Sequence, residues 1–80
     1  MYKVQSVIIK KEHSDLSKSA NWVINSGFKL GKIDSTPHTF RFRQLEPAKL
    51  RKEGYNHYIT KKISNDVSFI IAYKDNPIMV

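Results

Sequence analysis

Apolar and polar side chains alternate strictly in the middle of the chain, in the stretch TFRFR that starts at Thr39. A period of two is the repeat of a β-strand, so Phe40 and Phe42 are expected on one face. The other face carries Thr39, Arg41 and Arg43. This pattern predicts a sheet with one apolar and one basic face, and the rest of the chain has to cover the phenylalanines.

The small size of the chain limits what can be built around that sheet. It has 80 residues and no cysteine, so neither disulfides nor thiolate metal sites can support the fold. A core of this size leaves a stability of only a few kcal/mol. We expect a single domain over residues 1–80. The only apolar run near the start is Val7 to Ile9, which predicts no secretory signal, no membrane segment and a reducing compartment.

The first segment, Tyr2 to Lys10, is rich in β-branched residues and is expected to form a strand. Strict alternation would place Val4 and Ile8 on one face and would place Val7 and Ile9 on the other. Apolar residues on both faces indicate a central strand that is covered on both sides.

The next segment predicts one helix of about three turns. Ser14 or Asp15 is a suitable N-cap, and Gly27 is a suitable left-handed terminator. The expected buried residues follow helical spacing; they are Leu16, Ala20, Val23, Ile24 and Gly27.

The remaining segments predict further strands. A weak strand is expected over residues 28–35, the TFRFR strand begins after Pro37, and a hairpin turns at Asn65 and Asp66. Residues 46–54 fit a short helix begun by Pro47 and a solvated loop equally well. The expected fold class is α+β: a mostly antiparallel sheet of about five strands with one helix packed on one face, in the order strand, helix, strand, strand, strand, strand.

The sequence contains none of the motifs that carry catalytic chemistry. His13, His38 and His57 show no metal-ligand spacing, and the three glycines form no phosphate-binding loop. No serine stands in a nucleophile-elbow pattern. We therefore expect no metal, no cofactor and no enzymatic activity.

The charge of the chain favours a polyanionic partner. Fourteen Lys and Arg against seven Asp and Glu give a formal net charge of +7, and such a field attracts nucleic acid. Arg41 and Arg43, together with Lys61, Lys62 and Tyr58 of a later strand, could present cations and a ring to phosphates and bases. The same residue types are ordinary occupants of the solvated face of an antiparallel sheet, so both interpretations stay open here.

The order of short motifs resembles a small uncharacterised domain of bacteriophages and large DNA viruses. The resemblance covers most of the chain and is carried by VQSVII, AxW, GFK, FRFRQxxP and YxTK, which here are Val4 to Ile9, Ala20 with Trp22, Gly27 to Lys29, Phe40 to Gln44 with Pro47, and Tyr58 with Thr60 and Lys61. It implies a viral origin and lends no catalytic residue. If the shared motif is a binding face, the resemblance adds Gln44 to the candidates Arg41, Arg43 and Lys61. Such domains often carry acidic or asparagine residues before the arginine strand, where this chain has STPH, so the resemblance implies no role for that turn.

Together these observations lead to one expected function and two alternatives. We expect a small basic, non-enzymatic viral accessory domain that binds a polyanion, nucleic acid above all, through a basic and aromatic sheet face. The alternatives are a virion structural or capsid-associated protein that acts by protein–protein contacts, and an inhibitor of a host protein. An uncovered strand edge would also allow a homodimer. No membrane partner is expected, and the expected location is the virion or the interior of the host cell, in cytoplasm or nucleus.

Overall fold

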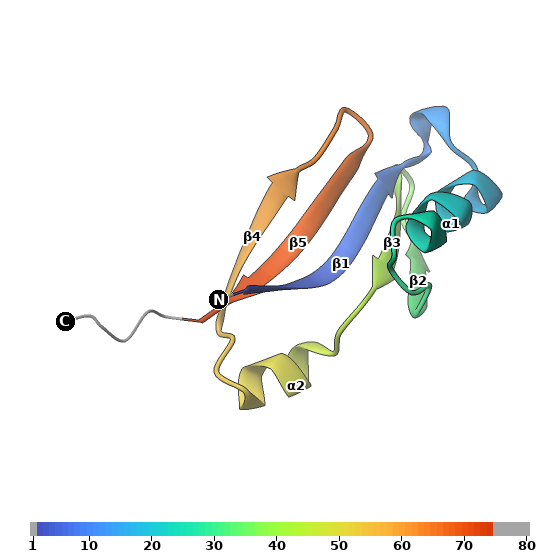
Figure 1. Ribbon diagram of the computed structural model, residues 1–80. Coiled ribbons are helices and arrows are strands. Elements are labelled where there is room, and N and C mark those ends of the chain that lie inside the picture. Colours follow the sequence, from blue (N-terminus) through green and yellow to red (C-terminus); the bar gives the residue numbers. More distant parts are fainter. Residues whose placement is uncertain (1, 75–80) are drawn as a thin grey trace.

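A computed structural model describes residues 2–74, apart from the side chain of His13. These residues form one antiparallel five-stranded sheet in the order β2-β3-β1-β5-β4 (Figure 1). The strands are β1 (Tyr2–Lys10), β2 (Lys32–Ser35), β3 (Thr39–Arg43), β4 (His57–Lys62) and β5 (Val67–Tyr73). The helices are a 3-10 turn η1 (Lys11–His13), α1 (Leu16–Asn25) and α2 (Pro47–Lys52). The predicted α+β class and antiparallel sheet are confirmed.

The central strand β1 contains an irregularity that alternation does not reveal. Val7 pairs with Phe42 of β3 and with Phe69 of β5, but the register with β5 shifts between Val4 and Ser6. Gln5 is therefore an extra residue in β1, as in a β-bulge. The bulge puts Val4 on the same face as Val7, so the predicted pairing of Val4 with Ile8 on one face is wrong.

Helix α1 covers the face of the sheet that carries the phenylalanines. Val7, Phe42 and Val23 are fully buried in one apolar cluster. The side chain of Asp15 caps the helix by accepting from the Lys18 amide at 2.8 Å. The chain leaves α1 through Gly27, whose φ of 88° is left-handed. The predicted start and end of this helix are confirmed.

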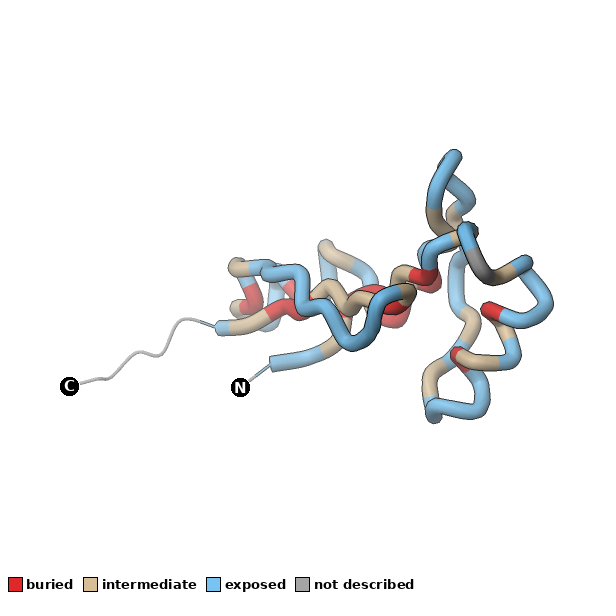
Figure 2. Tube along the Cα trace, turned by 90° about the horizontal axis from the view of Figure 1, so that it is seen from above, coloured by how far each residue is buried: buried red, intermediate tan, exposed pale blue. Residues whose placement is uncertain are grey.

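The side of α1 that faces the sheet differs from the predicted stripe. Leu16 and Ile24 are 46% and 54% exposed, whereas Ser19 and Val23 are buried. The hydroxyl of Ser19 lies 2.7 Å from that of Ser14, and this hydrogen bond allows a polar residue to be buried there. Figure 2 shows the buried positions of α1 turned toward the strands.

A second helix, α2, lies on the opposite face of the sheet. Its residue Leu50 is buried in a separate cluster with Tyr55 and Ala72. Side chains alternate along β5, so Ala72 points away from the face on which Val67 joins the cluster that contains Val23 of α1. Residues 46–54 fit a short helix and a loop equally well by sequence, and the structure shows a helix with Pro47 in its first turn. Each helix thus covers only part of one face.

Candidate nucleic-acid interface

The strand register gathers several cationic and hydroxyl side chains on the sheet face opposite α1. We call this surface the basic face. It includes Lys10, Thr39, Arg41, Thr60, Lys62 and Ser68, which share one face by alternation and pairing. The three cations among them are exposed, and they come from β1, β3 and β4.

The spacing of the cations follows from the pairing of the strands. Arg41 pairs with Ile8, Ile8 pairs with Ser68, and Ser68 pairs with Lys62, so one row crosses four strands. Three strand spacings separate Arg41 from Lys62, which is about 14 Å. Lys10 lies in the next row on this face. The basic face is therefore broad and shallow, and it is not a closed pocket.

The two arginines of the TFRFR strand differ in their surroundings. Arg43 lies 3.3 Å from the carboxylate of Glu46 and 3.9 Å from that of Asp34, with only 26% of its side chain exposed. Its charge is offset by these neighbours. Arg41 is exposed and forms no ion pair with any described residue. Of the two, Arg41 is the one whose charge is both exposed and not offset by a carboxylate of a described residue.

Gln44 serves the fold, because its amide is buried against the main chain of Lys29. The Lys29 amide donates to Oε1 of Gln44 at 3.0 Å, and Nε2 of Gln44 donates to the Lys29 carbonyl at 2.6 Å. The residue is only 8% exposed. The structure therefore places Gln44 inside the protein, away from a ligand on the basic face.

The remaining predicted site residues lie in β4, which pairs with β5, and they are found on both faces of the sheet. Lys61 pairs with Phe69 and lies on the α1 side of the sheet, away from Arg41. Tyr58 lies on the basic face and is 44% exposed, at the end near α2. The structure thus brings together Arg41, Lys62 and Tyr58 on the basic face, and Lys61 does not belong to it.

Sequence reasoning missed Lys10 as a member of the basic face. Alternation alone puts Lys10 on the face of Ile8, but the partner of this strand was unknown, so the lysine could not be placed beside Thr39 and Arg41. A prediction of the pairing between the first strand and the arginine strand would have found it.

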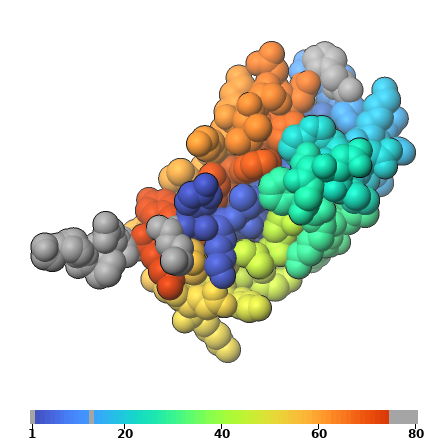
Figure 3. Space-filling view, in the orientation of Figure 1, coloured from blue at the N-terminus to red at the C-terminus, as the bar shows by residue number. Residues whose placement is uncertain are grey.

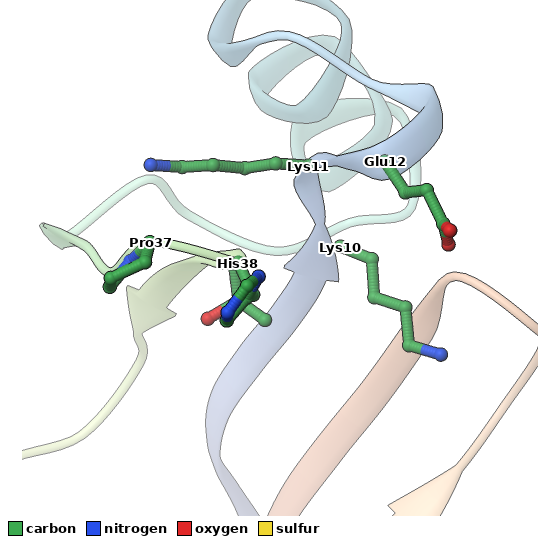
Figure 4. Close-up of a pocket in the computed structure, with 6 residues that line it drawn as sticks. Lys10, Lys11, Glu12, Pro37 and His38 are labelled. Carbon is green, nitrogen blue, oxygen red and sulfur yellow. The ribbon is translucent and has the colours of Figure 1, made fainter.

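A groove of about 440 Å³ lies at the end of the sheet beside Lys10, between η1 and the turn before β3. Thr36 shapes this turn, because its Oγ1 accepts from the Thr39 amide at 3.0 Å. Lys11 donates to Oγ of Ser35 at 2.6 Å, and Figure 4 shows it extended toward Pro37. In the same view Lys10 points the other way, as does Glu12. Because Lys11 is held by Ser35 and only Lys10 lies on the face of Arg41, only Lys10 is counted with the basic face.

No group of three His, Cys, Asp or Glu side chains converges anywhere in the described part of the chain. None of its helices has the length and apolar character needed to cross a membrane. A scan against models of protein families, a search of curated proteins and a search of solved structures found no match. The resemblance to a phage and viral domain therefore stays a prediction.

Proposed function

We propose that this protein binds the phosphates of nucleic acid through the basic face, without reading the base sequence. The observation that carries the proposal is the arrangement of Lys10, Arg41 and Lys62. All three are exposed on one side of the sheet, and none forms an ion pair with a described residue. Cations in this situation neutralise phosphates and release condensed counterions, which is the main source of sequence-independent affinity.

The chemistry of the face supports contacts to the backbone more than contacts to bases. Ser68 lies in the row between Arg41 and Lys62, and Thr60 lies in the adjacent row; both hydroxyls can donate to phosphate oxygens. Tyr58 is the one exposed ring on this face within residues 2–74, so stacking on bases is a minor part of the proposal. The viral setting is part of the proposal only through the resemblance of the sequence motifs.

A salt titration with matched variants tests the proposal. Protein freed of nucleic acid is titrated with a labelled single strand and with a duplex, using wild type, Arg41→Ala/Lys62→Ala and Lys18→Ala/Lys61→Ala. The last variant removes the same charge from residues that lie off the basic face. If both basic-face residues contact phosphates, the slope of log affinity against log salt falls by about 1.4 on single strands and about 1.8 on duplex.

Two results would contradict the proposal. One is that wild type fails to bind either nucleic acid even at low salt. The other is that the two double variants weaken binding equally, because the net charge alone would then account for the affinity. Far-UV circular dichroism of each variant shows that the sheet is retained, and it separates lost binding from lost folding.

A further inference from the structure

The outer edge of β4 has main-chain groups without partners in the sheet. β4 is the last strand in the order of the described sheet and pairs with β5 on one side only. The Ile63 amide donates to the Val67 carbonyl at 2.9 Å. In an antiparallel ladder hydrogen-bonded pairs alternate with pairs that point outward. The amide and carbonyl groups of Tyr58, Thr60 and Lys62 therefore point away from β5.

The side chains beside this edge form a shallow apolar groove on the α1 face of the sheet, in the part that the helix leaves uncovered. We call it the edge groove; it is lined by Tyr2, Ile59, Lys61, Ile71 and Tyr73 and has a volume of about 250 Å³. Ile59 is 50% exposed and Tyr2 is 67% exposed. Figure 3 shows α1 over the other end of this face, with atoms of β4 and β5 at the surface.

The charges at the edge select among the partners that could add a strand. Lys61 lies at the edge groove and Lys62 lies on the other face, so both sides of a strand added here would meet a lysine. No carboxylate lines the groove among residues 2–74, and neither lysine forms an ion pair with a described residue. Lysines on an edge strand oppose pairing with a second copy of the same strand. They favour a strand with acidic residues opposite them.

We propose that the edge of β4 binds an extended, acidic and apolar segment of another protein by strand addition. Main-chain hydrogen bonds to Tyr58, Thr60 and Lys62 would supply affinity, and the edge groove would supply specificity through alternate side chains. This site goes beyond nucleic-acid binding, because it uses Ile59 and Lys61, which lie on the opposite face from Arg41.

Antiparallel pairing, the more stable arrangement, fixes the order of residues in the partner. Read from its N-terminus, the segment has acidic residues opposite Lys62 and Lys61, a small or β-branched residue opposite Thr60, and apolar residues opposite Ile59 and Tyr58. A capped peptide with the order glutamate, glutamate, threonine, valine, phenylalanine meets this description. A peptide of the same composition with the order threonine, glutamate, phenylalanine, glutamate, valine is its control.

The first test compares prolines at the two edges of the sheet. Thr60→Pro removes an amide that points outward and keeps the bonds to β5, a position where proline is tolerated. The Thr36 amide donates to the Thr39 carbonyl, so by the same alternation Ile33 points outward from β2. We expect Thr60→Pro to weaken peptide binding about fivefold or more and Ile33→Pro to leave it unchanged. Ile59→Ala changes the edge groove on the face opposite Arg41, so it should weaken peptide binding but leave the salt dependence of nucleic-acid binding as in wild type, which keeps the two proposals separable.

The second test exchanges charges across the interface. Lys61→Glu should weaken binding of the first peptide, because like charges then lie opposite each other. A peptide with lysine in place of the glutamate opposite residue 61 should bind Lys61→Glu better than it binds wild type. If the exchange restores nothing, Lys61 does not face the peptide at this position and the proposed register is overturned.

The third test uses wild-type protein and does not depend on the folding of a variant. Amide hydrogen exchange at Tyr58, Thr60 and Lys62 should slow when the ordered peptide is added, whereas Ile59 and Lys61 are already bonded to β5. No slowing, or equal slowing with the scrambled peptide, would overturn the proposal. Slowing of the same amides with rising protein concentration alone, together with a dimer on sizing, would assign the edge to a second copy instead.

Discussion

At the scale of single residues, the side-chain amide of Gln44, just after β3, makes two hydrogen bonds to the main chain of Lys29 in the segment after α1. Gln44→Ala leaves the amide and the carbonyl of Lys29 without their partner. We expect a loss of about 1–3 kcal/mol in the free energy of unfolding, measured by urea denaturation. Gln44→Glu should also destabilise, because a carboxylate would then face the Lys29 carbonyl. Nucleic-acid binding of the folded fraction should not change in either variant. A specific loss of binding in Gln44→Ala would show that Gln44 contacts the ligand.

Two glycines with left-handed backbones differ in what surrounds them. Gly27 and Gly31 have φ values of 88° and 53°, but a Cβ at Gly27 meets no atom within 4 Å, whereas one at Gly31 collides with the carbonyl oxygen of Arg43. We expect Gly27→Ala to cost about 1–2 kcal/mol, from the backbone conformation alone. Gly31→Ala should cost clearly more, because β3 has to move. Equal midpoints of thermal unfolding for the two variants would contradict this explanation.

At the scale of elements, the orientation of α1 can be tested with a pair of substitutions on its two sides. Val23→Ala removes two buried methyl groups from the cluster with Val7 and Phe42 and should destabilise by about 2 kcal/mol. Ile24→Ala, at a residue 54% exposed, should change stability by about 0.5 kcal/mol or less. Denaturant midpoints of the two variants provide the measurement. A larger loss for Ile24→Ala would support the stripe that the sequence alone predicts.

Elements were predicted well from the sequence where one local pattern determined them. The bounds of β1, the cap at Asp15 and the apolar side of Phe40 and Phe42 all depend on neighbouring residues. The bulge at Gln5 carries no marker in the alternation, so the face of Val4 could not be predicted. Ser19 lies on the buried side of α1 with its hydroxyl hydrogen-bonded to that of Ser14, and helical spacing of apolar residues does not reveal this bond.

The candidate site was predicted only in part, because it depends on the register between distant strands. Lys61 and Lys62 are adjacent, so alternation already required them to lie on opposite faces. Which of the two joins Arg41 is decided by pairing across four strands. No local signal in the sequence contains that information.

At the scale of the whole molecule, the two apolar clusters should unfold as one unit. Strand β5 contributes Val67 to the cluster under α1 and Ala72 to the cluster under α2. Leu50→Val, a conservative change in the second cluster, should cost about 1 kcal/mol. We expect the fluorescence of Trp22, which packs against the first cluster, to report the same shift in midpoint as circular dichroism. Separate transitions would show that α2 opens independently of the rest.

Helices α1 and α2 cover opposite faces of the sheet at opposite ends of β5. This arrangement has a consequence for stoichiometry. Nucleic acid would lie along the basic face, and the side chains of a peptide added to β4 would enter the edge groove on the other face. Neither ligand would need to displace the other. One copy of so small a chain could then act as an adaptor in a complex of composition 1:1:1. The two ligands would meet at Tyr58, Thr60 and Lys62, whose side chains belong to the basic face and whose main-chain groups belong to the edge of β4.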